Sequence, residues 1–130
     1  MVCRSMRQER LSAATALLAL ILANPVTASD ATPGWAEISA IFDERCVMCH
    51  SKVAGASKGL RLDDYAAALS GGERGPVLIP GKAAESELIR RLRGQSVPRM
   101  PFLSRPLPEE QIVLIEAWIG AGLPETPDEK

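Results

Sequence analysis

Apolar residues recur every three or four positions in several stretches of the chain, which is the spacing of one face of an α-helix. The first stretch follows Thr32 and Pro33, which suit the N-cap and the first position of a helix. The apolar face of this helix carries Trp35, Ile38, Ile41 and Phe42. The helix leads to Cys46, and residues 51–59, rich in Ser, Lys, Gly and Ala, then predict a loop.

Two shorter segments follow this loop. Residues 62–69 predict a short capped helix that ends at Gly71 and Gly72, because glycine readily adopts the left-handed conformation after a helix. The segment 75–81 contains Pro76 and Pro80 between flanking glycines. This pattern excludes a regular helix there, although the centre of the segment is apolar.

The last third of the chain predicts two helices joined by a proline-rich loop. The first covers about 84–93 and ends at Gly94, with Leu88, Ile89 and Leu92 directed inward. Four prolines punctuate the following loop, which contains Met100. The last helix begins at Pro108, has acids in its first turn and ends at Gly120 or Gly122. Because no segment alternates apolar and polar residues over a useful length, the predicted fold class is all-α.

The N-terminal 28 residues have the pattern of a secretory signal peptide. A basic region is followed by an uncharged stretch over residues 11–23 and by small residues at 26–28 that suit signal cleavage. The alternative is a membrane anchor, but this run covers about 13 residues, fewer than the roughly 20 that a membrane-spanning helix needs. We therefore expect a periplasmic or otherwise exported protein with a polar lead (29–34), one domain (35–123) and a polar tail (124–130).

Removal of residues 1–28 would simplify the chemistry of the chain. Cys3 would leave with them, so that two cysteines and the single histidine remain. The mature chain would have 12 basic and 15 acidic residues, because three arginines and one glutamate are removed. This acidic balance argues against a nucleic-acid partner or an anionic membrane surface. No stable membrane span is expected after cleavage.

The remaining cysteines and the histidine form one motif, Cys46-Val47-Met48-Cys49-His50. The pattern C-x-x-C-H is the attachment signature of c-type haem. Two thiols three residues apart can each add to a haem vinyl group, and the histidine after the second thiol is brought under the iron. The motif therefore predicts one covalent haem at Cys46 and Cys49, with His50 as an iron ligand.

Other uses of this motif fit the chain less well. A thioredoxin-like dithiol follows a strand in a βαβ pattern, and no strand is predicted before Cys46. A structural zinc site takes four ligands, usually from two Cys or His pairs, and the mature chain has one cluster. A simple disulfide would close too few residues to constrain the unfolded chain much, and it would leave His50 unexplained.

The iron of a six-coordinate haem needs a second axial ligand opposite His50. The chain has no second histidine, and Met48 lies within the attachment loop. Met100 is therefore the candidate, since thioether sulfur is a usual partner of histidine in cytochromes c. It lies between Pro98 and Pro101, whose fixed φ angles would reduce the entropy lost in presenting the sulfur. The alternative is that Met100 only fills a gap in the core.

Several further segments occur in order around this motif. They are Ile41-Phe42, Gly59 to Asp63, Pro80-Gly81, Ser86 to Arg91, Arg99-Met100-Pro101, and the closing segment 112–122 with Trp118-Ile119. With them, residues 35–123 resemble the class I cytochrome c fold and, more narrowly, the planctomycete-type cytochrome c-like family. The resemblance implies about four short helices around one haem, with the first and last helices crossing. Phe42 would then pack against Ile115, Trp118 and Ile119, with Gly120 and Ala121 nearby.

The sequence differs from many cytochromes c in the group that would accept a hydrogen bond from the ligand histidine. In those proteins a Gly-Pro pair soon after the motif supplies a carbonyl that accepts a hydrogen bond from the histidine. Here the first such pair is Gly75-Pro76, so Pro76 and Pro80 are the candidates for this role.

Two groups of residues have both a functional and a simpler interpretation. One group would form haem-pocket walls or pack as ordinary core: Leu60, Leu62, Tyr65, Ile79, Leu88, Leu92 and Phe102. The other group would bind haem propionates or an acidic partner, or would form a solvated face: Arg90, Arg91, Arg93 and Arg99.

These observations predict an electron carrier, not an enzyme. A haem ligated by both His50 and Met100 has no open position for a substrate, so its partners would be redox proteins that meet it briefly. Two alternatives remain at this point. The chain would be the haem subunit of a dehydrogenase complex, or a ligand-binding or peroxidatic haem protein if Met100 does not bind the iron.

Overall fold

The computed structural model describes residues 31–127. The predicted signal peptide (1–28), the first residues of the polar lead and residues 128–130 lie outside the described residues. The elements in chain order are α1 (Trp35–Arg45), η1 (Ser57–Gly59), α2 (Tyr65–Ser70), η2 (Ala83–Glu85), α3 (Glu87–Leu92) and α4 (Glu109–Gly120). Within the described residues there is no strand, only one isolated bridge between Gly72 and Gly75. The predicted all-α fold is confirmed.

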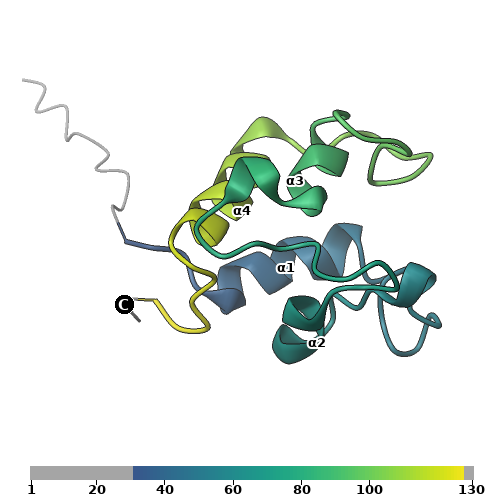
Figure 1. Cartoon of the computed structure of the whole chain (residues 1–130), viewed down its shortest axis with the longest axis horizontal. Coiled ribbons are helices and arrows are strands. Elements are labelled where there is room, and N and C mark those ends of the chain that lie inside the picture. Colours follow the sequence, from purple (N-terminus) through teal and green to yellow (C-terminus); the bar gives the residue numbers. More distant parts are fainter. Residues whose placement is uncertain (1–30, 128–130) are drawn as a thin grey trace, which may run out of the picture.

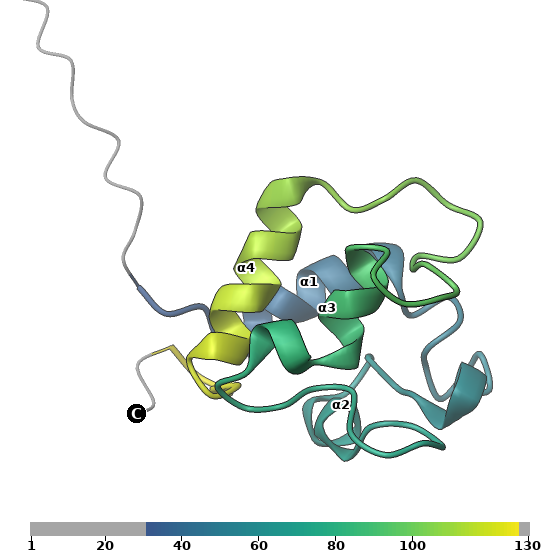
Figure 2. The ribbon, with the colours of Figure 1, turned by 45° about the horizontal axis from the view of Figure 1, so that its top comes forward.

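The first and last helices pack against each other, as predicted. α4 runs across α1 in Figure 2, and Phe42 meets Trp118 with ring centroids 6.5 Å apart. Trp118 is fully buried, and its indole Nε1 donates to the carbonyl of Pro124 at 2.9 Å. Gly120 and Ala121, expected near the crossing, are exposed instead, and a side chain at Gly120 would meet nothing within 4 Å. Aromatic packing, not small residues, therefore fixes this contact.

The start of α1 differs from the prediction. The helix begins at Trp35 and its N-cap is Gly34, whereas Thr32 was expected to be the cap. The carboxylate of Glu37 accepts from the Gly34 N–H at 2.8 Å, and the Trp35 N–H donates to the carbonyl of Glu125 at 2.9 Å. A Cβ atom at Gly34 would lie 2.8 Å from Pro127, so the chain after α4 sets where α1 begins.

The short helix after the loop is confirmed, with Asp64 as its cap. The Asp64 carboxylate accepts from the Ala67 N–H at 2.9 Å. The helix ends at Gly71, whose φ of 79° is unfavourable for other residues and where a Cβ would collide with the Gly75 carbonyl. The preceding loop contains one unpredicted element, the 3-10 turn η1.

The prediction of one continuous helix over 84–93 is wrong, because Ser86 interrupts the helix. Ser86 is extended (φ −69°, ψ 124°) and separates the 3-10 turn η2 from α3. Its buried hydroxyl donates to the Lys82 carbonyl at 3.0 Å and accepts from the Ile79 N–H at 2.9 Å. A serine hydroxyl that bonds nearby backbone competes with helix formation in this way.

An ion-pair cluster joins α3 to α4. Arg93, which follows α3, contacts Glu116 through two hydrogen bonds of 2.5 and 2.8 Å, and it also reaches Glu109 at 3.0 Å. The Arg93 guanidinium lowers the pKa of Glu116 below its usual value. The cluster therefore connects the end of α3 to α4.

No helix in the described part of the chain combines the length and the apolar character that crossing a bilayer requires.

Trp118→Phe should lower the free energy of unfolding by about 2–4 kcal/mol, because it leaves a cavity and a buried Pro124 carbonyl without its donor. Urea unfolding measures this change. Val113→Ala on the exposed side of the same helix is the control, with an expected effect within about 0.5 kcal/mol. Equal effects of the two substitutions would show that the indole contact does not fix the crossing.

Glu116→Gln should alter how stability depends on pH. Because the pKa of Glu116 is lowered in the folded state, its pair with Arg93 stabilises fully above the unfolded glutamate pKa, about 4.3. That contribution is lost as the pH falls through the lower folded value. The variant should be less stable at pH 7 and should lose less stability between about pH 5 and 3.

Urea unfolding at a series of pH values tests this expectation. Glu110→Gln, which removes an exposed carboxylate from the same helix, is the matched control. Parallel pH profiles for the wild type and Glu116→Gln would contradict it.

Candidate functional site

The C-x-x-C-H motif forms a compact turn at the end of α1. The Phe42 carbonyl accepts from the N–H groups of Cys46 at 2.7 Å and Val47 at 3.0 Å. The Cys46 carbonyl in turn accepts from Cys49 at 3.1 Å and His50 at 3.0 Å. Since Phe42 is buried in the helix crossing, the turn is attached directly to the core.

Backbone hydrogen bonds also hold the chain that follows the motif. The His50 carbonyl accepts from the N–H of Leu62, a buried residue, at 2.8 Å. The Cys49 carbonyl accepts from the Ser57 N–H at 2.9 Å. The loop 51–59 therefore returns to the motif, and hydrogen bonds to the backbone fix both ends of the turn.

The two thiols are free and differ in exposure, with Cys46 half-buried and Cys49 exposed. Burial raises the pKa of Cys46 to about 11, and nearby Arg45 lowers it only in part. A redox-active dithiol depends on a thiol whose pKa is lowered, so that the thiolate forms at neutral pH. The environment of Cys46 therefore disfavours the thioredoxin-like alternative.

The imidazole of His50 is half-buried, and one of its two nitrogens has an unusual environment. Nδ1 is buried without a hydrogen-bond partner among the described residues. The carbonyls of Pro76 and Pro80 were candidate acceptors, and neither accepts from Nδ1. A buried polar atom without a partner costs about 1–3 kcal/mol, and no described group offsets this cost at Nδ1.

A cavity of about 890 Å³ adjoins the motif. Figure 1 shows two of the chain segments that line it at the right of the molecule, with the chain after α1 below and the loop after α3 above. The motif contributes Cys46, Met48, Cys49 and His50, and the loop contributes Val97, Pro98, Met100, Pro101, Phe102 and Ser104. The volume is at the upper end of the roughly 300–1,000 Å³ usual for ligand sites.

Met100, half-buried, is held at this cavity through its backbone. Its N–H donates to the carbonyl of Arg91 in α3 at 3.1 Å. The structure therefore brings all four predicted haem contacts, Cys46, Cys49, His50 and Met100, to the lining of one cavity.

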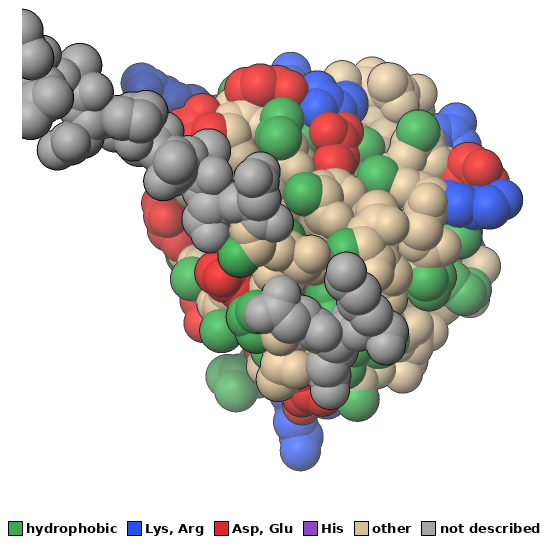
Figure 3. Space-filling view, turned by 90° about the vertical axis from the view of Figure 1, so that its left-hand side faces the viewer, with side chains coloured by type: hydrophobic (Ala, Val, Ile, Leu, Met, Phe, Trp, Pro, Cys, Tyr) green, Lys and Arg blue, Asp and Glu red, His purple; other side chains and the backbone are tan. Residues whose placement is uncertain are grey.

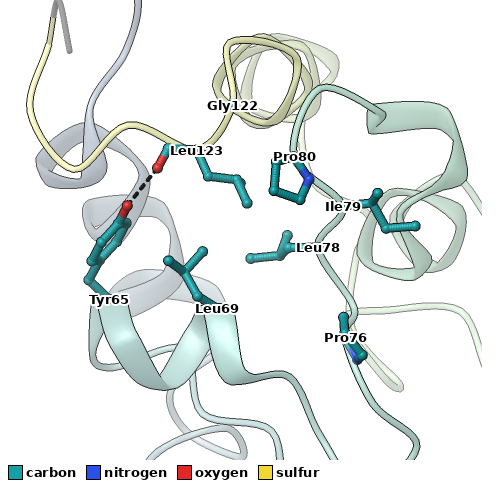
Figure 4. A pocket seen from close by; sticks show the side chains of 8 residues that line it. All are labelled: Tyr65, Leu69, Pro76, Leu78, Ile79, Pro80, Gly122 and Leu123. Carbon is teal, nitrogen blue, oxygen red and sulfur yellow. Dashed lines mark hydrogen bonds between the residues drawn. The ribbon is translucent and has the colours of Figure 1, made fainter. Parts of the chain in front are cut away.

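Most of the expected pocket walls also line this cavity. They are Leu60, Leu62, Leu88, Leu92 and Phe102. Tyr65 and Ile79 line a separate pocket of about 350 Å³, in which the Tyr65 hydroxyl donates to the Leu123 carbonyl at 2.7 Å (Figure 4). This smaller pocket is bordered by apolar side chains and contains none of the residues in the motif.

Several residues of the larger cavity could not be predicted from the sequence. The tight turn after α2 contributes Gly72 to Val77, and charged side chains at the cavity are Glu44, Arg45, Lys58, Glu73, Arg74, Glu87 and Arg91. The glycines around Pro76 were a signal for a tight turn, but nothing indicated that the turn faces the motif. Of the four clustered arginines only Arg91 lines the cavity, since Arg93 binds α4.

The cavity and its donor atoms fit a haem. Its lining is mainly apolar, and it offers two thiols, one imidazole and one thioether, which are the groups that attach and ligate haem in cytochromes c. Within residues 31–127, His, Cys, Asp and Glu side chains do not gather in threes or more as they would around a bare metal ion.

Charge is mixed on the surface. On the face shown in Figure 3, acidic and basic side chains occur side by side, and neither sign forms a continuous field. This face therefore has no single-sign region of the kind that steers a strongly charged partner.

Comparison with known proteins gives one match. The family model described as Planctomycete cytochrome C matches residues 46–101. No curated protein and no solved structure matches the chain. The matched segment runs from the first cysteine of the motif to the proline after Met100, so it contains all four candidate haem contacts. The resemblance predicted from the sequence is confirmed, since residues 46–101 match the model of the planctomycete cytochrome C family.

Proposed function

We propose that this protein is an exported c-type cytochrome that binds one haem covalently and carries single electrons between redox proteins. The observation that carries the proposal is the cavity whose lining includes both thiols of the motif, the His50 ring and Met100. The family match supports a cytochrome of the c type.

Each of these residues has a distinct role in the proposal. Cys46 and Cys49 would hold the haem through thioether bonds, while His50 Nε2 and the Met100 sulfur would ligate the iron. The bound haem supplies an iron centre that accepts and releases one electron. The chain keeps water from the centre with Leu62, Leu88 and Leu92, which are buried and line the cavity.

The proposed ligand set favours electron transfer over catalysis. His50 and Met100 together would fill both axial positions of the iron, so no position is open to a substrate. Export is part of the proposal, since residues 1–28 have the pattern of a signal peptide.

The protein produced together with a haem-attachment system should have the mass of residues 29–130 plus one haem under denaturing conditions. A pyridine haemochrome spectrum should show thioether-linked haem. Cys46→Ser and Cys49→Ser should each remove one thioether bond and lower the yield of holoprotein. Cys3→Ser is the matched control and should change neither, because Cys3 lies in the segment predicted to be cleaved. Free thiols at both cysteines of the motif would refute haem attachment.

Met100→Ala should abolish the methionine-to-iron absorption band of the oxidised protein and lower the reduction potential, because a neutral thioether ligand favours reduced iron. Met48→Ala is the control, since Met48 is 88% exposed and belongs to the attachment turn. It should retain the band. An unchanged spectrum of Met100→Ala would show that another group ligates the iron.

A further inference from the structure

Arg91 contacts the loop that carries Met100 through both its side chain and its backbone. Its guanidinium Nη1 donates to the Pro98 carbonyl at 3.1 Å, and its Nε donates to the carboxylate of Glu87 at 2.6 Å. The Arg91 carbonyl accepts from the Met100 N–H at 3.1 Å. One residue of α3 thus binds the loop through both its side chain and its backbone.

Glu87 completes this arrangement one helical turn earlier. The carboxylate oxygen that binds Arg91 also accepts from the Ser96 hydroxyl at 2.9 Å. The hydrogen bond from Arg91 is the main cause that lowers the pKa of Glu87 below its usual value, and the hydrogen bond from Ser96 lowers it further. The carboxylate is therefore charged at neutral pH. We call the set Glu87, Arg91, Ser96, Pro98 and Met100 the α3 clamp.

The clamp is partly shielded from water. The Arg91 side chain is 18% exposed and lines the cavity, whereas the neighbouring Arg90 is exposed. Charge-assisted hydrogen bonds of this kind are stronger than neutral ones, and shielding preserves them. The Arg91 geometry therefore restrains residues 96–100 more than a solvated surface arginine would.

A neutral thioether is a weak ligand, so its binding to iron depends on how well the loop is preorganised. We propose that Arg91 is a positioning residue that holds loop 96–100 on α3 and thereby keeps the Met100 sulfur at the iron. The proposal rests on the proposed function, in which Met100 is the axial ligand. It assigns Arg91 to the loop and not to the haem propionates.

The test uses the holoprotein and measures how tightly imidazole displaces the sulfur from oxidised iron. Arg91→Met should make imidazole bind roughly tenfold more tightly and weaken the methionine-to-iron band, the change expected from losing charge-assisted hydrogen bonds. Arg90→Met is the matched control, with less than about a twofold effect. Equal affinities of Arg91→Met and Arg90→Met would overturn the proposal.

A double variant separates positioning from other roles. In Met100→Ala there is no sulfur to displace, so adding Arg91→Met should cause no further change in imidazole affinity. A persistent effect in that background would overturn the proposal and assign Arg91 to the propionates or to general stability. If Met100→Ala itself leaves imidazole affinity and the band unchanged, the axial assignment fails, and the clamp fails with it.

Glu87→Gln and Ser96→Ala provide variants that keep Arg91 in place if Arg91→Met does not fold. Glu87→Gln weakens the contacts to both Arg91 and Ser96, whereas Ser96→Ala removes only the second, so both should tighten imidazole binding and Ser96→Ala should have the smaller effect. Wild-type affinity in both variants would contradict the clamp, while the Met100→Ala result would still stand as evidence on the proposed function.

Discussion

The contact between Phe42 in α1 and Trp118 in α4 is the constraint on which the candidate site depends. Phe42 is buried, and its carbonyl is also the acceptor for the first two N–H groups of the attachment turn. The position of the turn therefore follows from the packing of the two helices. The Trp118 indole donates to the chain after α4, and that chain also accepts from the first residue of α1, so the same segment joins the end of α4 to the start of α1.

The side that carries Met100 is built differently. α3 has six residues, too few for a helix that is stable alone, so tertiary contacts have to support it. Ser86 fixes its start, Arg93 joins its end to α4, and Leu88, Ile89 and Leu92 bury its inner face. The loop beyond it is bound to α3 by hydrogen bonds to Glu87, Arg90 and Arg91, and Met100 packs against the core. Its position is thus set by α3 and, through α3, by the same core.

Local patterns were enough to predict part of this arrangement. The attachment motif is contiguous, and the apolar faces of α1 and α4 have helical spacing, so both could be found without tertiary information. Elimination was enough to propose Met100, which the structure places at the cavity. The start of α1 could not, because Pro127 and Glu125 determine it from the other end of the chain. Ser86 looked like an ordinary helical residue, since its acceptor and donor become neighbours only after folding. Arg91 was indistinguishable in sequence from Arg90.

The two sides of the cavity therefore differ in how easily they open. The His50 side is tied to buried Phe42 and Leu62, so displacing it requires exposure of the core. The Met100 side depends on hydrogen bonds of partly exposed groups, and segments with few buried apolar contacts open at a lower free energy. Under the proposed function, exchange of an axial ligand would begin at Met100 while the haem stays attached at Cys46 and Cys49. The ligand strength at the iron, and with it the reduction potential, would then be tuned from α3 and not from the attachment turn.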